Sequence, residues 1–117
     1  MRHSKNNKKL NKPTDQRMAM LKNMVISLFE HQKILTTDTR AKEAKKLAEA
    51  LITLSKQDTV HSRRMAYSVL PHKPTISNLF DSIREKFKDR NGGYTRITKV
   101  GLRKGDGAVK SVLEFVN

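Results

Sequence analysis

The sequence contains no cysteine, no tryptophan and no long hydrophobic run. Without cysteine the chain forms no disulfide and offers no thiolate to a metal, which is compatible with a reducing cytosol. The most apolar stretch, residues 24–29, is far shorter than the ~20 residues that a membrane-spanning helix needs. No apolar segment of a secretory signal follows the basic first residues. We therefore expect a soluble cytoplasmic protein with no membrane partner.

Acidic residues are also scarce. The 117 residues include 25 Lys and Arg but 11 Asp and Glu, so the formal net charge is +14. Two stretches, 1–24 and 84–110, together carry +12 of this charge. Such a chain repels itself unless a polyanion neutralises it, and closely spaced cations act together in displacing counterions from phosphates. The composition therefore predicts a nucleic-acid partner that docks on these two stretches.

Signals of catalysis are missing. The four histidines have no Asp, Glu or Cys at the spacing of a metal site or a proton relay. The glycine patterns of nucleotide-binding loops and the HExxH pattern of zinc proteases do not occur. We therefore expect no enzymatic activity, no metal, no cofactor and no small-molecule substrate, with a ribonuclease as a distant alternative.

Periodicity divides the chain into a basic arm and one domain. Residues 1–13 contain a single sizeable apolar side chain, so we expect a flexible arm, followed by one domain over residues 14–117. Helical spacing of apolar residues predicts four helices, and alternation predicts three strands. The expected elements are a helix capped by Thr14 and running to about His31, a strand over 33–37, a helix begun by Asp38 or Thr39, a helix begun by Asp58 or Thr59 and ended by Pro71 and Pro74, a helix from a Thr75 cap to Asn91-Gly92, and strands over 94–102 and 108–116. This α-β-α-α-α-β-β order predicts a two-layer α+β fold with helices packed on one side of a small sheet.

The stretch 90–99 joins the last helix to the C-terminal hairpin and combines two glycines, a tyrosine and basic residues. Glycine permits positive φ, Tyr94 offers a ring that can stack on a base, and the cations seek phosphates. A structural alternative stays open, in which Asn91-Gly92 is a helix C-cap and Tyr94 belongs to the core. No DNA-recognition helix is evident, and charge spread for reading shape favours RNA.

The residues expected to bind RNA are basic, with the addition of one tyrosine. In the arm and the first helix they are Arg2, His3, Lys5, Lys8, Lys9, Lys12, Arg17 and Lys22. In the hinge and the hairpin they are Arg90, Tyr94, Arg96, Lys99, Arg103 and Lys104.

Several segments resemble the family of bacterial large-subunit ribosomal protein number seventeen, nearly from end to end. The most distinctive are Met1-Arg2-His3, the stretch from Thr36-Thr37 to Glu43, and Gly92-Gly93-Tyr94-Thr95-Arg96-Ile97. The resemblance implies a two-layer fold with a three-stranded mixed sheet, binding to 23S ribosomal RNA, and contact with large-subunit protein number thirty-two. Lys12-Pro13 and Arg40 depart from the family pattern but keep positive charge nearby.

Together these observations predict a structural constituent of the large ribosomal subunit that supports translation. The arm and the hairpin would neutralise phosphates where RNA helices crowd together. The alternative is a free RNA- or DNA-binding regulator or chaperone that acts outside the ribosome.

Overall fold

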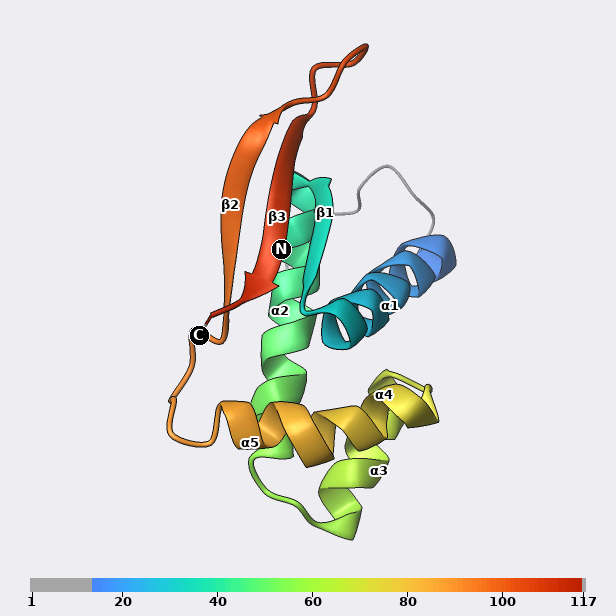
Figure 1. Cartoon of the computed structure of the whole chain (residues 1–117). Coiled ribbons are helices and arrows are strands. Elements are labelled where there is room, and N and C mark those ends of the chain that lie inside the picture. Colours follow the sequence, from blue (N-terminus) through green and yellow to red (C-terminus); the bar gives the residue numbers. More distant parts are fainter. Residues whose placement is uncertain (1–13, 117) are drawn as a thin grey trace, which may run out of the picture.

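The computed structural model describes residues 14–116, which form helices packed on one small sheet (Figure 1). In chain order the elements are α1 (Thr14–His31), β1 (Lys33–Thr37), α2 (Asp38–Ser55), α3 (Val60–Val69), α4 (Lys73–Asn78), the π-helical η1 (Leu79–Ile83), α5 (Arg84–Lys86), β2 (Thr95–Leu102) and β3 (Val109–Phe115). Helix α2 runs along one face of the sheet, α1 lies beside it, and α3, α4 and α5 lie beyond one end of the strands (Figure 1). The predicted α+β class is confirmed. The arm over residues 1–13 lies outside the described residues.

The sheet is antiparallel throughout, with the strand order β1-β3-β2. Both β1 and β2 pair antiparallel with β3, and Val112 of β3 lies between Leu35 of β1 and Thr98 of β2. The expectation of a mixed sheet is therefore wrong. Strands β1 and β2 do run in the same direction, but β3 separates them, so no parallel pair forms.

Small side chains allow α2 to pack closely on the sheet. Ala41, Ala44 and Ala48 recur at three- and four-residue spacing on α2, and all three are fully buried. On β3, every second side chain from Ser111 onward is buried on the face that packs against the core: Ser111, Leu113 and Phe115. The core therefore lies between α2 and one face of the sheet, with α1 and the later helices closing its sides.

The third and fourth predicted helices occur, but their boundary differs from the expectation. Thr59 is the N-cap of α3, and its Oγ1 accepts a hydrogen bond of 3.0 Å from the Ser62 amide. Pro74 does not end that helix, because it lies in the first turn of α4, where proline's missing N–H is tolerated. Thr75 is accordingly a buried residue within α4 and not its cap.

Helices α4, η1 and α5 follow one another as a single rod from Lys73 to Lys86 (Figure 1). The rod ends before the predicted Asn91-Gly92, with Phe87 as its C-cap. The Phe87 amide donates to the carbonyls of Ile83 and Arg84, so the last turn tightens before the chain leaves the helix.

Four aromatic rings join the sheet to the helices. Phe115 of β3 lies 6.0 Å from Phe29 of α1 and 5.4 Å from Phe87, measured between ring centroids. Phe87 in turn lies 5.3 Å from Tyr94, which is 3% exposed. Stacking of Tyr94 on an RNA base is therefore wrong as a prediction, and the core alternative holds, because this ring packs against the end of the rod.

Replacing Phe87 by Ala should lower the free energy of unfolding by about 3–5 kcal/mol, because the substitution removes two ring contacts and leaves a cavity. Urea unfolding followed by circular dichroism measures the loss. Val60→Ala is the matched control on an exposed side chain and should change the free energy by less than about 0.5 kcal/mol. Equal effects of the two substitutions would contradict the structural role of the ring cluster.

Candidate nucleic-acid interface

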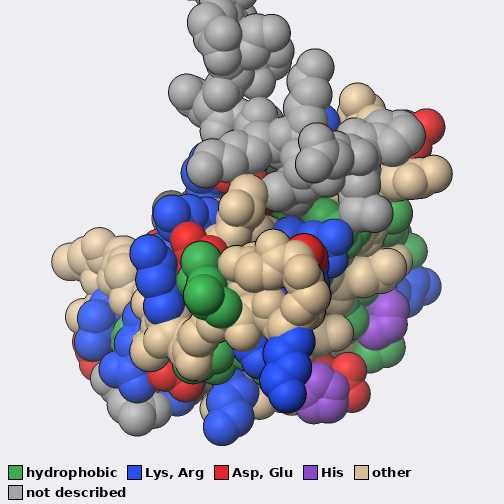
Figure 2. Space-filling model, turned by 90° about the horizontal axis from the view of Figure 1, so that it is seen from above, with side chains coloured by type: hydrophobic (Ala, Val, Ile, Leu, Met, Phe, Trp, Pro, Cys, Tyr) green, Lys and Arg blue, Asp and Glu red, His purple; other side chains and the backbone are tan. Residues whose placement is uncertain are grey.

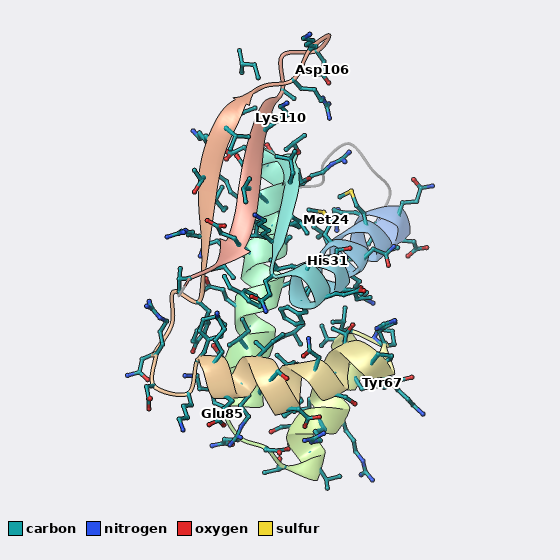
Figure 3. All side chains as sticks on the ribbon, in the orientation of Figure 1. Met24, His31, Tyr67, Glu85, Asp106 and Lys110 are labelled. Carbon is teal, nitrogen blue, oxygen red and sulfur yellow. The ribbon has the colours of Figure 1, made fainter. Side chains whose placement is uncertain are left out.

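The hairpin formed by β2 and β3 projects past the helices at one end of the molecule (Figure 1). Its turn carries Asp106 at the tip, and Lys110 lies at the distal end of β3 (Figure 3). The pairing register shifts between Lys99 and Gly101, so Val100 forms a bulge in β2. A bulge bends its strand and increases the local twist, which separates the distal half of the hairpin from the part packed on the core.

Carboxylates engage two of the cations on this hairpin. Arg96 of β2 pairs with Glu114 of β3 at 2.9 Å, and Arg103 pairs with Asp106 across the turn. The other hairpin cations, Lys99, Lys104 and Lys110, form no ion pair with any carboxylate in residues 14–116. Their charges are therefore available to an external anion.

Hydrogen bonds within the turn between β2 and β3 hold its conformation. Asp106 accepts hydrogen bonds from Arg103 Nε at 3.1 Å and from the Ala108 amide at 3.1 Å. The hydrogen bonds from Arg103, followed by that from Ala108, lower the pKa of Asp106 to about 2. Gly105 has a φ of +98°, a conformation that favours glycine. Arg103 thus stabilises the turn, whereas the neighbouring Lys104 remains exposed at the tip.

Ser111, in the middle of β3, fixes the hairpin to the first turn of α2. The Ser111 hydroxyl donates a hydrogen bond of 2.8 Å to Asp38 Oδ1, and Lys42 pairs with the other oxygen at 3.1 Å. These interactions, with the Ser111 hydrogen bond contributing most, lower the pKa of Asp38. The carboxylate also lies in the first turn of α2, where the helix dipole favours negative charge.

A second anchor holds the proximal end of β2. Glu49 Oε2 accepts hydrogen bonds from the Thr95 amide at 3.1 Å, from the Thr95 hydroxyl at 2.7 Å and from Lys45 Nζ at 2.6 Å. Lys45 also donates to the Thr95 carbonyl at 3.0 Å. Burial acts to raise the pKa of Glu49, but the hydrogen bonds from Lys45 and Thr95 outweigh it, and the pKa is lowered. The cluster ties the start of β2 to α2.

Lys56 holds the segment between the rod and the hairpin. Its ammonium donates to the Phe87 carbonyl at 2.6 Å and to the Arg90 carbonyl, and it lies 5.1 Å from the centroid of the Tyr94 ring. A cation here adds to the hydrogen bond that the Phe87 carbonyl accepts from the Arg90 amide, and it complements the helix dipole. Lys56 is therefore a positioning residue for the hinge and not a cation available to RNA.

The structure spreads the remaining predicted site residues over other parts of the surface. Arg17 and Lys22 lie on α1, half-buried, and Arg90 is exposed in the hinge. None of these three forms an ion pair within residues 14–116. The predicted residues of the arm lie outside the described residues: Arg2, His3, Lys5, Lys8, Lys9 and Lys12.

Ion pairs engage many cations on the helices. Lys42, Lys45, Lys46, Arg63 and Lys88 each lie within 3.1 Å of a carboxylate on the same helix or next to it. Seen from above, Lys and Arg side chains occur in several separate groups with Asp and Glu among them (Figure 2). The net positive charge thus comes from the cations that lack a carboxylate partner, and the β2–β3 hairpin carries three of these, Lys99, Lys104 and Lys110.

Sequence reasoning missed three residues that matter to this surface. Lys110 alternates with buried neighbours on β3, a pattern that indicates an outward side chain and could have placed it with Lys104. The contacts of Lys45 with Thr95 and of Lys56 with Phe87 gave no such signal, because these partners lie 50 and 31 residues away in the chain.

Other kinds of site find no support in residues 14–116. This part of the chain contains no group of three or more His, Cys, Asp or Glu side chains placed to hold a metal ion. None of its helices is long and apolar enough to cross a membrane.

Comparison with known proteins decides the family. A family model described as Ribosomal protein L17 matches residues 20–116. This chain belongs to the ribosomal protein L17 family. It is 53% identical over 116 residues to the large ribosomal subunit protein bL17 of Dictyoglomus thermophilum, covering 99% of this chain and 100% of the relative. The corresponding protein of Clostridium perfringens is 52% identical over 109 residues, 93% of this chain and 96% of the relative, and that of Desulforapulum autotrophicum is 47% identical over 116 residues, 99% and 97%.

Membership of the L17 family confirms the resemblance recognised in the sequence. The family consists of structural proteins of the ribosome, so membership also confirms the prediction that the chain is not an enzyme.

The Asp106 carboxyl group should titrate with a pKa of about 2 in the folded protein, below its ordinary pKa of 3.8. Because the folded-state pKa is depressed, the contribution of this carboxylate to turn stability is present above about pH 4 and disappears as the pH falls through 2. An NMR titration of the Asp106 carboxyl carbon measures the midpoint. Arg103→Gln should return the midpoint toward 3.8, and a normal midpoint in the unmodified protein would contradict the Arg103–Asp106 arrangement.

Proposed function

We propose that this member of the L17 family binds 23S ribosomal RNA through the distal β2–β3 hairpin and the basic arm at residues 1–13. Family membership makes the chain a structural protein of the large ribosomal subunit, bound to the ribosome in the cytoplasm. The observation that carries the proposal is that three lysines without an ion pair, Lys99, Lys104 and Lys110, lie along a hairpin that extends beyond the helices. Asp106, labelled in Figure 3, lies at the outer tip of this hairpin.

Phosphate binding is the chemistry that suits this hairpin. Each lysine ammonium supplies a point charge with three donors, and each phosphate it neutralises releases condensed counterions from the RNA. The internal ion pairs at Arg96 and Arg103 keep the strands and the turn in register, so the three free lysines are presented on an ordered scaffold. An ordered scaffold reduces the conformational entropy lost on binding.

The proposal includes the basic arm because of its amino-acid composition. Residues 1–13 contain five Lys and Arg and no Asp or Glu. A segment of this composition binds phosphates without its own core and adapts its path to the shape of a folded RNA. Arg17 and Lys22 on α1 would extend the same contact into the domain.

The proposal includes a protein neighbour. The family resemblance implies contact with large-subunit protein number thirty-two. The outer face of the sheet has the chemistry of such a contact, because Leu35, Val100 and Val112 line a groove of about 410 Å³ there. A free regulator or chaperone is the second candidate, but no observation on the described residues favours it over the ribosomal role.

The experiment replaces Lys99, Lys104 and Lys110 together by Gln and measures binding to a 23S rRNA transcript at several salt concentrations. Each lost phosphate contact should lower the salt slope of the binding constant by ~0.7–0.9, so the triple variant should lose about 2–3 from the slope. Removing residues 1–12 in a separate variant should lower the slope further, while circular dichroism shows the fold intact.

A matched control removes three exposed lysines that lie outside the hairpin. Lys33→Gln, Lys86→Gln and Lys88→Gln change the net charge by the same amount but leave the hairpin and its anchors to α2 unchanged. This control should keep most of the salt slope. An equal loss in both triple variants would mean that total charge alone governs binding, and it would sink the hairpin's assigned role.

A further inference from the structure

Tyr67 is the exception among the aromatic residues. The chain has four Phe, two Tyr and no Trp, and all six rings lie in the part that the structure describes. Five of them are at most 6% exposed, whereas Tyr67 on α3 is 41% exposed. Because the ring of Tyr94 is buried, Tyr67 is the aromatic side chain in residues 14–116 that can stack on an external group. The RNA contacts proposed above do not include it.

The surroundings of Tyr67 favour an anionic partner. Residues 59–80 contain Arg63, Arg64 and Lys73 but no Asp or Glu. The acids that flank this stretch, Asp58 and Asp81, both pair with Arg63, at 2.6 and 3.7 Å. Arg63 also lies over the Phe80 ring at 4.8 Å, so it is engaged within the fold.

Arg64 is left as the cation next to Tyr67. It is exposed and forms no ion pair with a described carboxylate. It precedes Tyr67 by three residues on α3, and this spacing makes side chains neighbours on a helix. An aromatic face and a free guanidinium therefore share one side of α3.

The exposed apolar side chains of α3 do not form one patch for a protein partner. With about 100° of rotation per residue, Val60 and Tyr67 lie on one ridge, and Met65 and Val69 lie on another. The strip between the ridges is polar and is made by His61, Arg64 and Ser68. A ring beside a basic strip suits a base with its phosphate better than it suits an apolar protein surface.

We infer that α3 holds an unpaired nucleotide of RNA, with Tyr67 stacked on the base and Arg64 bound to the adjacent phosphate. The inference rests on the proposed RNA-binding function and adds a second, separate site to it. Tyr67 and the hairpin tip at Asp106 lie at opposite ends of the molecule (Figure 3). The protein therefore bridges two RNA segments, with phosphate contacts at the hairpin and base stacking at α3.

The test uses the full chain and a 23S rRNA transcript. Tyr67→Ala should weaken binding by roughly 5- to 150-fold, the usual effect of losing one stacked base, with little change in the salt slope. Tyr67→Phe keeps the ring and should bind within about twofold of the unmodified protein. Arg64→Gln should lower the salt slope by ~0.7–0.9. Val69→Ala, on the other ridge, is the control and should bind like the unmodified chain.

A spectroscopic readout reports stacking directly. The chain has no tryptophan, so Tyr67→Trp introduces a single indole whose fluorescence should be quenched when the transcript is added. Full affinity of Tyr67→Ala together with an unquenched indole would overturn the inference. A Tyr67→Ala variant that binds the transcript with full affinity but is absent from assembled large subunits would assign α3 to a protein neighbour. That result would also overturn the inference.

The hairpin variants separate this inference from the proposed function. If the hairpin triple variant loses its salt slope while Tyr67→Ala binds normally, the proposed function stands and the α3 site is refuted. If the unmodified chain fails to bind the transcript, both are refuted.

Discussion

The fold depends on the packing of Phe115, Phe87, Tyr94 and Phe29 where the sheet meets the helices. Without this cluster the strands would be held to the helical layer mainly by α2, because the rod from Lys73 to Lys86 lies beyond one end of the sheet. The rings fix the proximal end of the hairpin, and Lys56 donates to the carbonyls of the hinge beside them. With its base held in this way, the distal hairpin can extend into solvent and still keep a defined direction.

Charge is distributed to match this architecture. Carboxylates on the helices engage nearby lysines, and Glu49 and Asp38 use their hydrogen bonds to anchor β2 and β3 to α2. Exposed ion pairs of this kind add little stability, but they lower the density of free cations on the helical body. Three of the lysines that lack such partners, Lys99, Lys104 and Lys110, lie on the β2–β3 hairpin, which projects past the helices. On the proposed function, bound RNA would offset the self-repulsion of a net charge of +14.

Local patterns in the sequence were sufficient for most of the elements. The strand at 33–37 agrees with the structure, and the first helix differs only at Thr14, which was expected as its cap and lies inside α1, because periodicity acts within a few residues. Tyr94 could not be assigned with certainty, since its burial depends on Phe87 and on Lys56 from another helix. The prediction of a mixed sheet, which the family resemblance implied, was wrong. Periodicity could not correct it, because strand order depends on long-range pairing. The set of lysines that lack an ion pair also depends on residues distant in the chain. The four-residue spacing on α2, however, could have predicted the Lys42–Asp38 pair.

The most direct test of the central claim is lysine modification of the protein in isolated large ribosomal subunits and free in solution, with each site quantified by mass spectrometry. The account predicts that Lys99, Lys104 and Lys110 react with the acylating reagent in the free protein and are strongly protected in the subunit. Exposed lysines of the helical body, such as Lys88, should lose much less of their reactivity. Equal reactivity of the three hairpin lysines in both states would contradict the claim that this surface binds ribosomal RNA.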